Sequence, residues 1–294
     1  MTVASVGVLA KAAIGASNPV DLPLEFITDT VKKIGSINDT NGIRGTRSHY
    51  AARTRTGTSK VSGQLVCMPS PVELDYLLYR VMGTAKNGNV FALAETLPEF
   101  YYSVDRVAKV PVYAGCKAVK MTFAGSAGNL ITVTMDVEGK TESVGASGSF
   151  PTLTMDYGPP YHFADSTSGV VINGTTYLIS DFELTIDNTF NGDRFTNSLT
   201  RTDLPVFDRT VGLKLTLPYT ADEVGLHGAG YDGLSASITF TNNTRSCAFT
   251  FAALQFPEDS PTIASKDEIS MVLNCIARRT ASTAELSVSN DSTV

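Results

Sequence analysis

The sequence is short of the residues on which most catalytic and metal sites depend. It contains no tryptophan and only three histidines, and its cysteines are widely spaced, without a C-x-x-C pair. Neither the cysteines nor the histidines have the spacing of zinc ligands, which argues against a metal site. In a chain of 294 residues this pattern indicates reduced, mostly buried thiols and a reducing compartment. The four cysteines are Cys67, Cys116, Cys247 and Cys275.

Motifs of catalysis and nucleotide binding are also missing. There is no H-E-x-x-H, no G-x-S-x-G and no Walker loop. A G-x-G-x-x-G starts at Gly228, but an alternating strand pattern follows it where dinucleotide binding needs a helix, so we interpret it as a turn. The sequence therefore predicts a protein that is not an enzyme and has no cofactor, although an active site assembled from distant residues stays open.

Long apolar runs and an excess of positive charge are absent too. No segment approaches the roughly 20 apolar residues of a membrane span. Residues 1–16 lack the charged start of a secretory signal, because their only charge, Lys11, lies in the middle. The formal net charge is −6, and an acidic surface repels phosphate. We therefore expect no membrane association, and DNA only as a passing cargo.

The sequence is rich in the patterns of β-strands. Thr, Ser, Val and Gly are plentiful. Apolar and polar residues alternate over residues 131–137, 182–187 and 234–241, as they do in half-buried antiparallel strands. We therefore predict a mostly β fold.

An internal repeat organises the chain. The motif N-G-x-R-x-T-x-S occurs at residues 41–48 and again, 150 residues later, at residues 191–198. This repetition predicts two related halves. Without gaps, the same alignment matches Asn38 with Asn188, Val61 with Val211, Leu65 with Leu215 and Glu73 with Glu223.

Each half also contains a capping box, which predicts the start of a helix. In the first half Ser70 and Glu73 flank Pro71, apolar residues follow at helical spacing, and Gly83 can end the helix in a left-handed conformation. In the second half the box begins at Thr220, so a helix is expected from Ala221. Three glycines follow, and this second helix must therefore be short.

These patterns predict two tandem related domains, each a β-sandwich or rolled sheet with one flanking α-helix. We expect an N-terminal arm over residues 1–21 and a first β domain over residues 22–142. A connector rich in glycine and proline follows over residues 143–169, and the second β domain covers residues 170–294.

A basic stretch lies between the acidic residues Asp39 and Glu73. Few aromatic residues accompany it, so it does not look like a platform on which bases stack. In an acidic chain, contact with an acidic face of a neighbouring subunit explains this stretch better than nucleic acid does. A solvated loop is the alternative. The candidate inter-subunit residues are Arg44, Arg47, Arg53, Arg55 and Lys60.

Taken together, these features resemble the tail tube proteins of long-tailed bacteriophages, in particular a duplicated type of about this length. The resemblance covers most of the chain, from about Leu22 to Asn290. It is carried by the N-terminal arm, the N-G-x-R turn, the strand that ends at Pro69, the capped helix, the segment from Phe182 to Asn188 and the closing strand that ends in Asn290-Asp291-Ser292.

The resemblance implies a structural virion protein whose copies form stacked rings around a channel for genome delivery. It implies further copies of the chain, a tape-measure protein and tail-terminator or tip proteins as partners. It also implies assembly in the host cytoplasm and a final place in the phage tail. Two related halves would let three chains complete a ring of approximate sixfold symmetry, and six chains per ring is the alternative.

Two other classes of function stay open. One is a different virion component, such as a tail-tip or head–tail joining protein. The other is a β-sandwich module that binds a surface or a carbohydrate.

Overall fold

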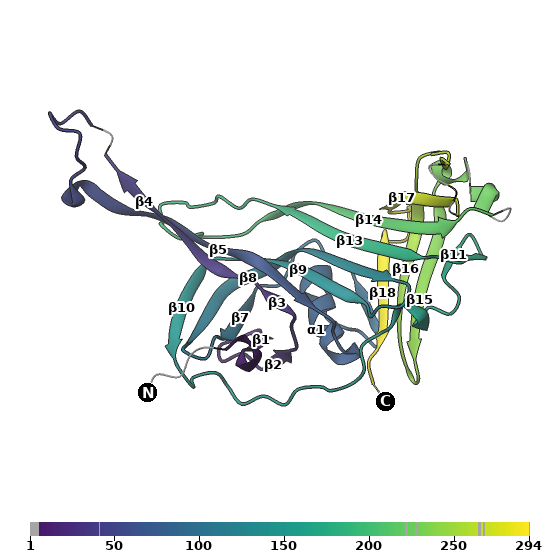
Figure 1. The fold of residues 1–294 in the computed structure, drawn as a ribbon, viewed down its shortest axis with the longest axis horizontal. Coiled ribbons are helices and arrows are strands. Elements are labelled where there is room, and N and C mark those ends of the chain that lie inside the picture. The colour runs from purple at the N-terminus through teal and green to yellow at the C-terminus, as the bar shows by residue number, and fades with distance from the viewer. Residues whose placement is uncertain are drawn as a thin grey trace.

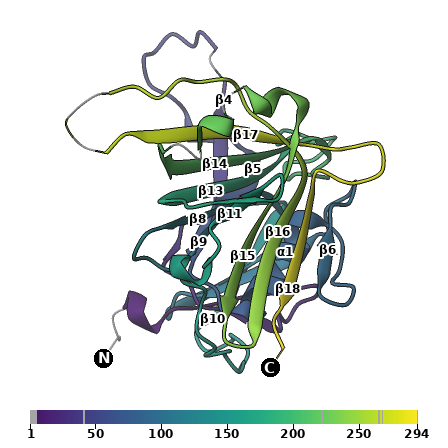
Figure 2. The same ribbon diagram turned by 90° about the vertical axis from the view of Figure 1, so that its right-hand side faces the viewer.

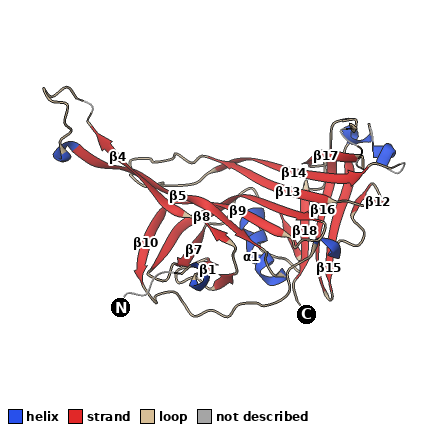
Figure 3. Ribbon diagram, in the orientation of Figure 1, coloured by secondary structure: helices blue, strands red, loops and turns tan. Residues whose placement is uncertain are grey.

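Strands make up most of the fold. The computed structural model describes residues 6–40, 42–220, 223–226, 228–263, 266 and 268–293. In this part of the chain the named strands pair in antiparallel fashion, and one α-helix, α1 (Pro71–Met82), packs against them (Figure 3). The prediction of a mostly β fold is confirmed.

The connector separates an earlier from a later group of strands. The strands up to the connector are β1 (Lys11–Gly15), β2 (Leu22–Leu24), β3 (Thr28–Asp29), β4 (Lys32–Asp39), β5 (Thr54–Cys67), β6 (Val90–Ala92), β7 (Phe100–Asp105), β8 (Lys109–Ser126), β9 (Thr132–Gly139) and β10 (Thr141–Ala146). The later strands are β11 (Val170–Ile172), β12 (Thr175–Tyr177), β13 (Asp181–Phe190), β14 (Val206–Pro218), β15 (Leu234–Asn242), β16 (Arg245–Gln255), β17 (Ser270–Arg278) and β18 (Leu286–Asp291). Short 3-10 helices are η1 (Gly7–Leu9), η2 (Ala51–Arg53), η3 (Phe163–Asp165), η4 (Glu223–Leu226) and η5 (Ala229–Asp232).

One run of seven strands crosses both halves of the chain. Its order is β4-β5-β9-β8-β13-β14-β17, and every neighbouring pair is antiparallel. Most of these strands lie side by side along the length of the molecule in Figure 1. Side chains alternate along them, so that Leu65, Met135 and Leu184 are buried on one face while polar residues lie on the other. We call the polar side the open face.

The remaining strands and α1 cover the buried face of this long sheet. β1, β2, β7 and β10 lie on one side of α1, and β15, β16 and β18 lie on the other (Figures 1 and 2). The helix contacts elements of both halves, among them β2, β8, β16 and β18. A single hydrophobic core therefore joins the two halves.

The capping box forms α1 where the sequence predicts it. The Ser70 hydroxyl accepts a hydrogen bond from the Glu73 amide at 3.2 Å, and the Glu73 carboxylate accepts from the Ser70 amide at 2.9 Å. Gly83 ends the helix in the left-handed region at a φ of 90°. Leu77 and Leu78 are fully buried, as expected for the apolar side of a helix that packs on sheets.

The strand pairings of the first half recur in the second. In the first half β1 pairs with β2 and β7, β8 pairs with β7, β9 and β10, and β5 pairs with β9 and β4. In the second half β11 pairs with β12 and β15, β16 pairs with β15, β17 and β18, and β14 pairs with β17 and β13. The two sets of pairings match when each strand is compared with its counterpart. The counterparts are β1 and β11, β2 and β12, β4 and β13, β5 and β14, β7 and β15, β8 and β16, β9 and β17, and β10 and β18.

A shared bulge aligns the two hairpins more closely than the sequence repeat does. In β4–β5 the register shifts between Gly35 and Ile37, and in β13–β14 it shifts between Asn188 and Phe190. Aligned on this bulge, Gly35 corresponds to Asn188, three residues away from the match of Asn38 with Asn188 in the sequence repeat. The hairpin loop is three residues longer in the first half, and the ungapped alignment could not reveal this.

The structure differs from two further expectations. Ala12, Ala13 and Ile14 are buried in β1, so this part of the expected N-terminal arm belongs to the first sheet. Its apolar residues show no alternation because the strand is covered on both faces. The predicted helix start at Ala221 lies outside the described residues, and the residues that follow form η4 and η5 in place of an α-helix. Glycines in this segment disfavour a longer helix.

All four cysteines are buried free thiols, as the sequence predicts. Burial raises the pKa of every one of them, that of Cys275 to about 12. We expect no reaction with a thiol reagent in the folded protein at neutral pH, because the reactive thiolate does not form. After denaturation without a reductant, mass spectrometry should count four modified groups per chain. A count of two or fewer would reveal disulfides and a different compartment.

Candidate assembly surfaces

The hairpin of β4 and β5 extends away from the body of the protein (Figure 1). We call the described residues from Lys32 to Lys60 the arm. All five candidate contact residues lie on it. Arg44 and Arg47 lie in its loop, Arg53 ends η2, and Arg55 and Lys60 lie on β5. The arm therefore presents the basic stretch at a distance from the core, and its role as a subunit contact stays a prediction.

Some of the arm's charges are engaged within the arm. The Arg44 guanidinium lies 3.6 Å from a carboxylate oxygen of Asp39 and donates to the Thr40 carbonyl. The His49 ring contacts the same carboxylate, and this hydrogen bond holds the pKa of Asp39 below its usual value. Arg47, Arg53 and Arg55, by contrast, are exposed and form no ion pair with any described residue. These three arginines are the arm's candidates for pairing with another chain.

Strand β4 has almost no contact with the core. Its residues from Lys32 to Asn38 are all exposed, and the Ile37 side chain is 79% exposed. Its equivalent β13 buries Phe182, Leu184 and Ile186. In the described structure β4 pairs on one side only, with β5. An exposed edge strand with apolar side chains is a site at which another strand can add.

The junction between the halves shows such an addition within one chain. β13 pairs with β8 over residues 181–187 and 120–126. The Thr122 and Thr185 hydroxyl groups lie 3.4 Å apart across the junction, and Lys120 lies opposite Asp187. Because β13 is an edge of the second half and β8 an edge of the first, the junction joins the two halves through their sheet edges.

The open face of the seven-stranded sheet carries both signs of charge. Lys120 lies opposite Asp136 on one side and Asp187 on the other, and Lys214 lies opposite Glu183. Threonines occupy many of the positions between them. Cross-strand neighbours of opposite charge keep the local potential of this face low.

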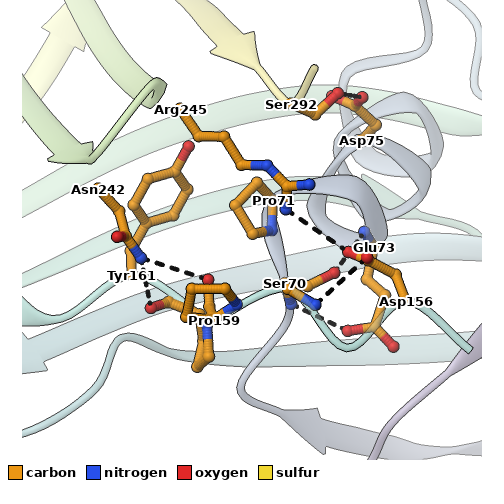
Figure 4. A network of polar contacts seen from close by, with 12 residues as sticks. Ser70, Pro71, Glu73, Asp75, Asp156, Pro159, Tyr161, Asn242, Arg245 and Ser292 are labelled. Carbon is orange, nitrogen blue, oxygen red and sulfur yellow. Dashed lines mark hydrogen bonds and ion pairs between the residues drawn. The ribbon is translucent and has the colours of Figure 1, made fainter. Parts of the chain in front are cut away.

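A polar network fixes the connector to both halves around the start of α1 (Figure 4). The Asn290 amide donates to the Pro71 carbonyl at 2.7 Å and to the Asp75 carboxylate at 2.6 Å, and the Tyr161 hydroxyl donates to Asn290 at 3.3 Å. Lys86 forms an ion pair with Asp75 at 2.8 Å. The network therefore ties β18 of the second half to α1 of the first.

Two further contacts hold the connector itself. Asn242 donates to the carbonyls of Pro159 and Pro160, each at 3.4 Å, and Arg245 lies 3.8 Å from Asp156 (Figure 4). The sequence does not predict this network because its members are up to 219 residues apart. One signal was available: Asn290 occupies an inward position of its strand, after Leu286 and Val288, where an apolar residue is expected.

We expect Asn290→Ala to lower the free energy of unfolding by about 2 to 3 kcal/mol, since it removes two buried hydrogen bonds, to the Pro71 carbonyl and to the Asp75 carboxylate. Asn87→Ala, at an exposed turn, is the matched control and should change stability by less than about 0.5 kcal/mol. Urea unfolding followed by circular dichroism measures both. Equal effects of the two variants would show that the network does not hold the halves together.

The described residues contain no cluster of His, Cys, Asp or Glu that could hold a metal ion. His49 lies in the arm loop and His162 caps η3, whereas His227 lies outside the described residues. Gly228 precedes η5 and a strand, so the glycine motif forms a turn, as predicted. Among the described helices, none is long and apolar enough to cross a membrane.

The described structure is a β-rich protein with an extended antiparallel sheet, a projecting basic arm and a polar open face. Comparison with protein families identifies the family to which this chain belongs. The family described as phage tail tube protein matches residues 3–288, which is nearly the whole chain. The chain therefore belongs to the phage tail tube protein family, a family of structural tail proteins, and the resemblance drawn from its sequence is confirmed at this level. Among curated proteins, none is similar to it.

Proposed function

We propose that this chain assembles with further copies into stacked rings of a phage tail tube, and that the channel of the tube conducts the genome into the host. Three chains form each ring. The observation that supports this most strongly is the recurrence of one set of strand pairings in both halves, with the two halves joined edge to edge through β8 and β13.

The number of chains follows from the geometry of such a junction. A head-to-tail contact repeated between equivalent units closes a ring when the rotation per unit divides a full turn. If the contact between chains repeats the contact between the halves, six related units at about 60° each complete the ring, and three chains supply them. Contacts of this kind in permanent assemblies bury about 2,000 Å² or more.

We assign the open face of the seven-stranded sheet to the channel. Its lysines lie opposite carboxylates, so it carries no continuous cationic surface. A cationic wall would bind DNA through release of counterions and would slow its passage. A face of balanced charge lets DNA pass as cargo without holding it.

The arm supplies a second kind of contact. Arg53 ends η2 and Arg55 lies near the start of β5, in the hairpin that extends away from the body of the protein (Figure 1). We propose that they bind acidic residues of another subunit. A tape-measure protein and tail-terminator or tip proteins complete the assembly, which takes place in the host cytoplasm and ends in the virion.

Negative-stain microscopy of the purified protein tests the proposal. We expect rings or tubes with a central hole, at protein concentrations where a permanent assembly is stable. A homogeneous monomer at every concentration would exclude a tube subunit. It would instead favour a binding module.

A further inference from the structure

Among the described residues, part of β17 has no strand paired with one of its edges, whereas its counterpart β9 is paired on both. β9 pairs with β5 on one side and with β8 on the other along nearly its whole length. β17 pairs with β14 along residues 270–276, but only residues 276–278 pair with β16. Within the described structure, residues 270–275 of β17 therefore have one unpaired edge.

A groove runs along this unpaired edge. It has a volume of about 370 Å³ and lies between residues 259–263 and the strand residues Met271, Val272 and Asn274. Val272 is 39% exposed beside it. In the first half β8 continues along β9 at this place, and β13 adds to the outer edge of β8.

The segment that borders the groove corresponds to the second part of β8. Gln255 lies beside β17 as Lys117 lies beside β9. Four residues further along the chain, Asp259 therefore corresponds to Met121. Met121 lies opposite Ile186 of β13 in the junction between the halves. The equivalent of Ile186 is thus the residue expected opposite Asp259.

That equivalent is found on β4. Lys33 lies opposite Val61 in the first half. Ile186 lies opposite Val211, the residue that the sequence repeat matches with Val61. Strand β4 is exposed on both faces and unpaired on its outer side in the described structure. In the described structure each chain therefore has a strand edge like that of β13 without a partner, and a segment, residues 256–263, beside which such an edge fits.

The charges of the two surfaces are complementary. Lys32 and Lys33 are exposed on β4. Asp259 and Glu268 are exposed at the groove, which they line. The residues that correspond to Lys33 and Asp259 at the junction within the chain are Ile186 and Met121, and both are apolar. Opposite charges at the groove give a contact between two chains its own specificity.

We propose that residues 256–263, which border the groove where β8 lies beside β9 in the first half, bind β3 and β4 of a second copy of this chain along their outer edge, with Lys33 of that copy opposite Asp259. Sheet addition of this kind is a common mode of recognition, in which backbone hydrogen bonds give affinity and side chains give register. The inference rests on the proposed function, since it identifies the contact that would close the ring. It fixes the register of this contact at one residue pair.

Cysteine cross-linking in the full-length protein tests the register. Side chains opposite each other on antiparallel strands have Cβ atoms about 4.5–5.5 Å apart. The four native cysteines are buried and do not interfere. In assembled K33C/D259C protein, a short thiol-to-thiol cross-linker should give a covalent ladder that ends at three chains. The control K33C/E95C uses an exposed acidic position away from the groove and should give at least tenfold less product.

The outcomes separate this inference from the proposed function. Tubes that form without cross-linking above the control would overturn the inference and leave the tube intact. A wild-type chain that forms no tubes would overturn the proposed function itself. If the two cysteine substitutions prevent assembly, exchanging the charges of Lys33 and Asp259 tests the register instead. Lys33→Asp and Asp259→Lys should each reduce assembly at least tenfold, and the double variant should restore it, whereas no restoration would overturn the register.

Discussion

Gly63→Ala should lower the free energy of unfolding by about 3 kcal/mol or more, and should prevent tube formation. Gly63 lies on β5 where the segment before β4 crosses it. A Cβ atom at this position would lie 2.4 Å from the Val31 Cα atom and 2.5 Å from the Thr30 carbonyl oxygen. Both are backbone atoms, so the substitution can be accommodated only if the segment that carries β4 moves.

Gly212→Ala, on β14, is the matched control for this prediction. The nearest atom to its added Cβ would be the Cys275 carbonyl oxygen at 3.9 Å, which is an ordinary contact. We expect this variant to fold and assemble as the wild type does. Thermal unfolding and negative-stain microscopy measure both variants. If Gly63→Ala assembles normally, the position of β4 does not matter for the tube.

The double variant R53E/R55E should lose assembly by at least tenfold while its melting temperature stays within about 1 °C of the wild type. Both side chains are exposed and have no ion partner among the described residues, so their reversal removes no contact that stabilises the fold. Placing like charges across an interface costs several kcal/mol, which is far more than such an assembly tolerates.

A second charge reversal controls for net charge. K11E/K109E makes the same change at two exposed positions on β1 and β8. Sedimentation velocity at two salt concentrations compares the variants. Normal assembly of R53E/R55E would show that the arm is a solvated surface and that its arginines have no role in assembly. Equal loss of assembly in both variants would point to net charge and not to the arm.

The sequence predicts those parts of the structure that depend on interactions between residues close together in the chain. Ser70, Glu73 and Gly83 define α1 because a capping box and a left-handed glycine act within a few residues. The alternation from Phe182 to Ile186 predicts β13 because a strand with one buried face needs only a period of two.

What escaped prediction depends on pairing between distant segments. β1 shows no alternation because residues on both of its faces are buried, and this burial depends on segments distant in the sequence. The network at Asn290 joins residues 215 positions apart. The five candidate contact residues were found from charge alone, but the exposed edge of β4 and the groove along β17 follow only from strand register.

The symmetry of a single ring tests the central claim most directly. If the two halves occupy equivalent places, image analysis of tubes by electron cryomicroscopy should give threefold symmetry with approximate sixfold density. The mass of one ring should then be three times that of the 31.2 kDa chain. Six chains per ring would contradict the equivalence of the halves.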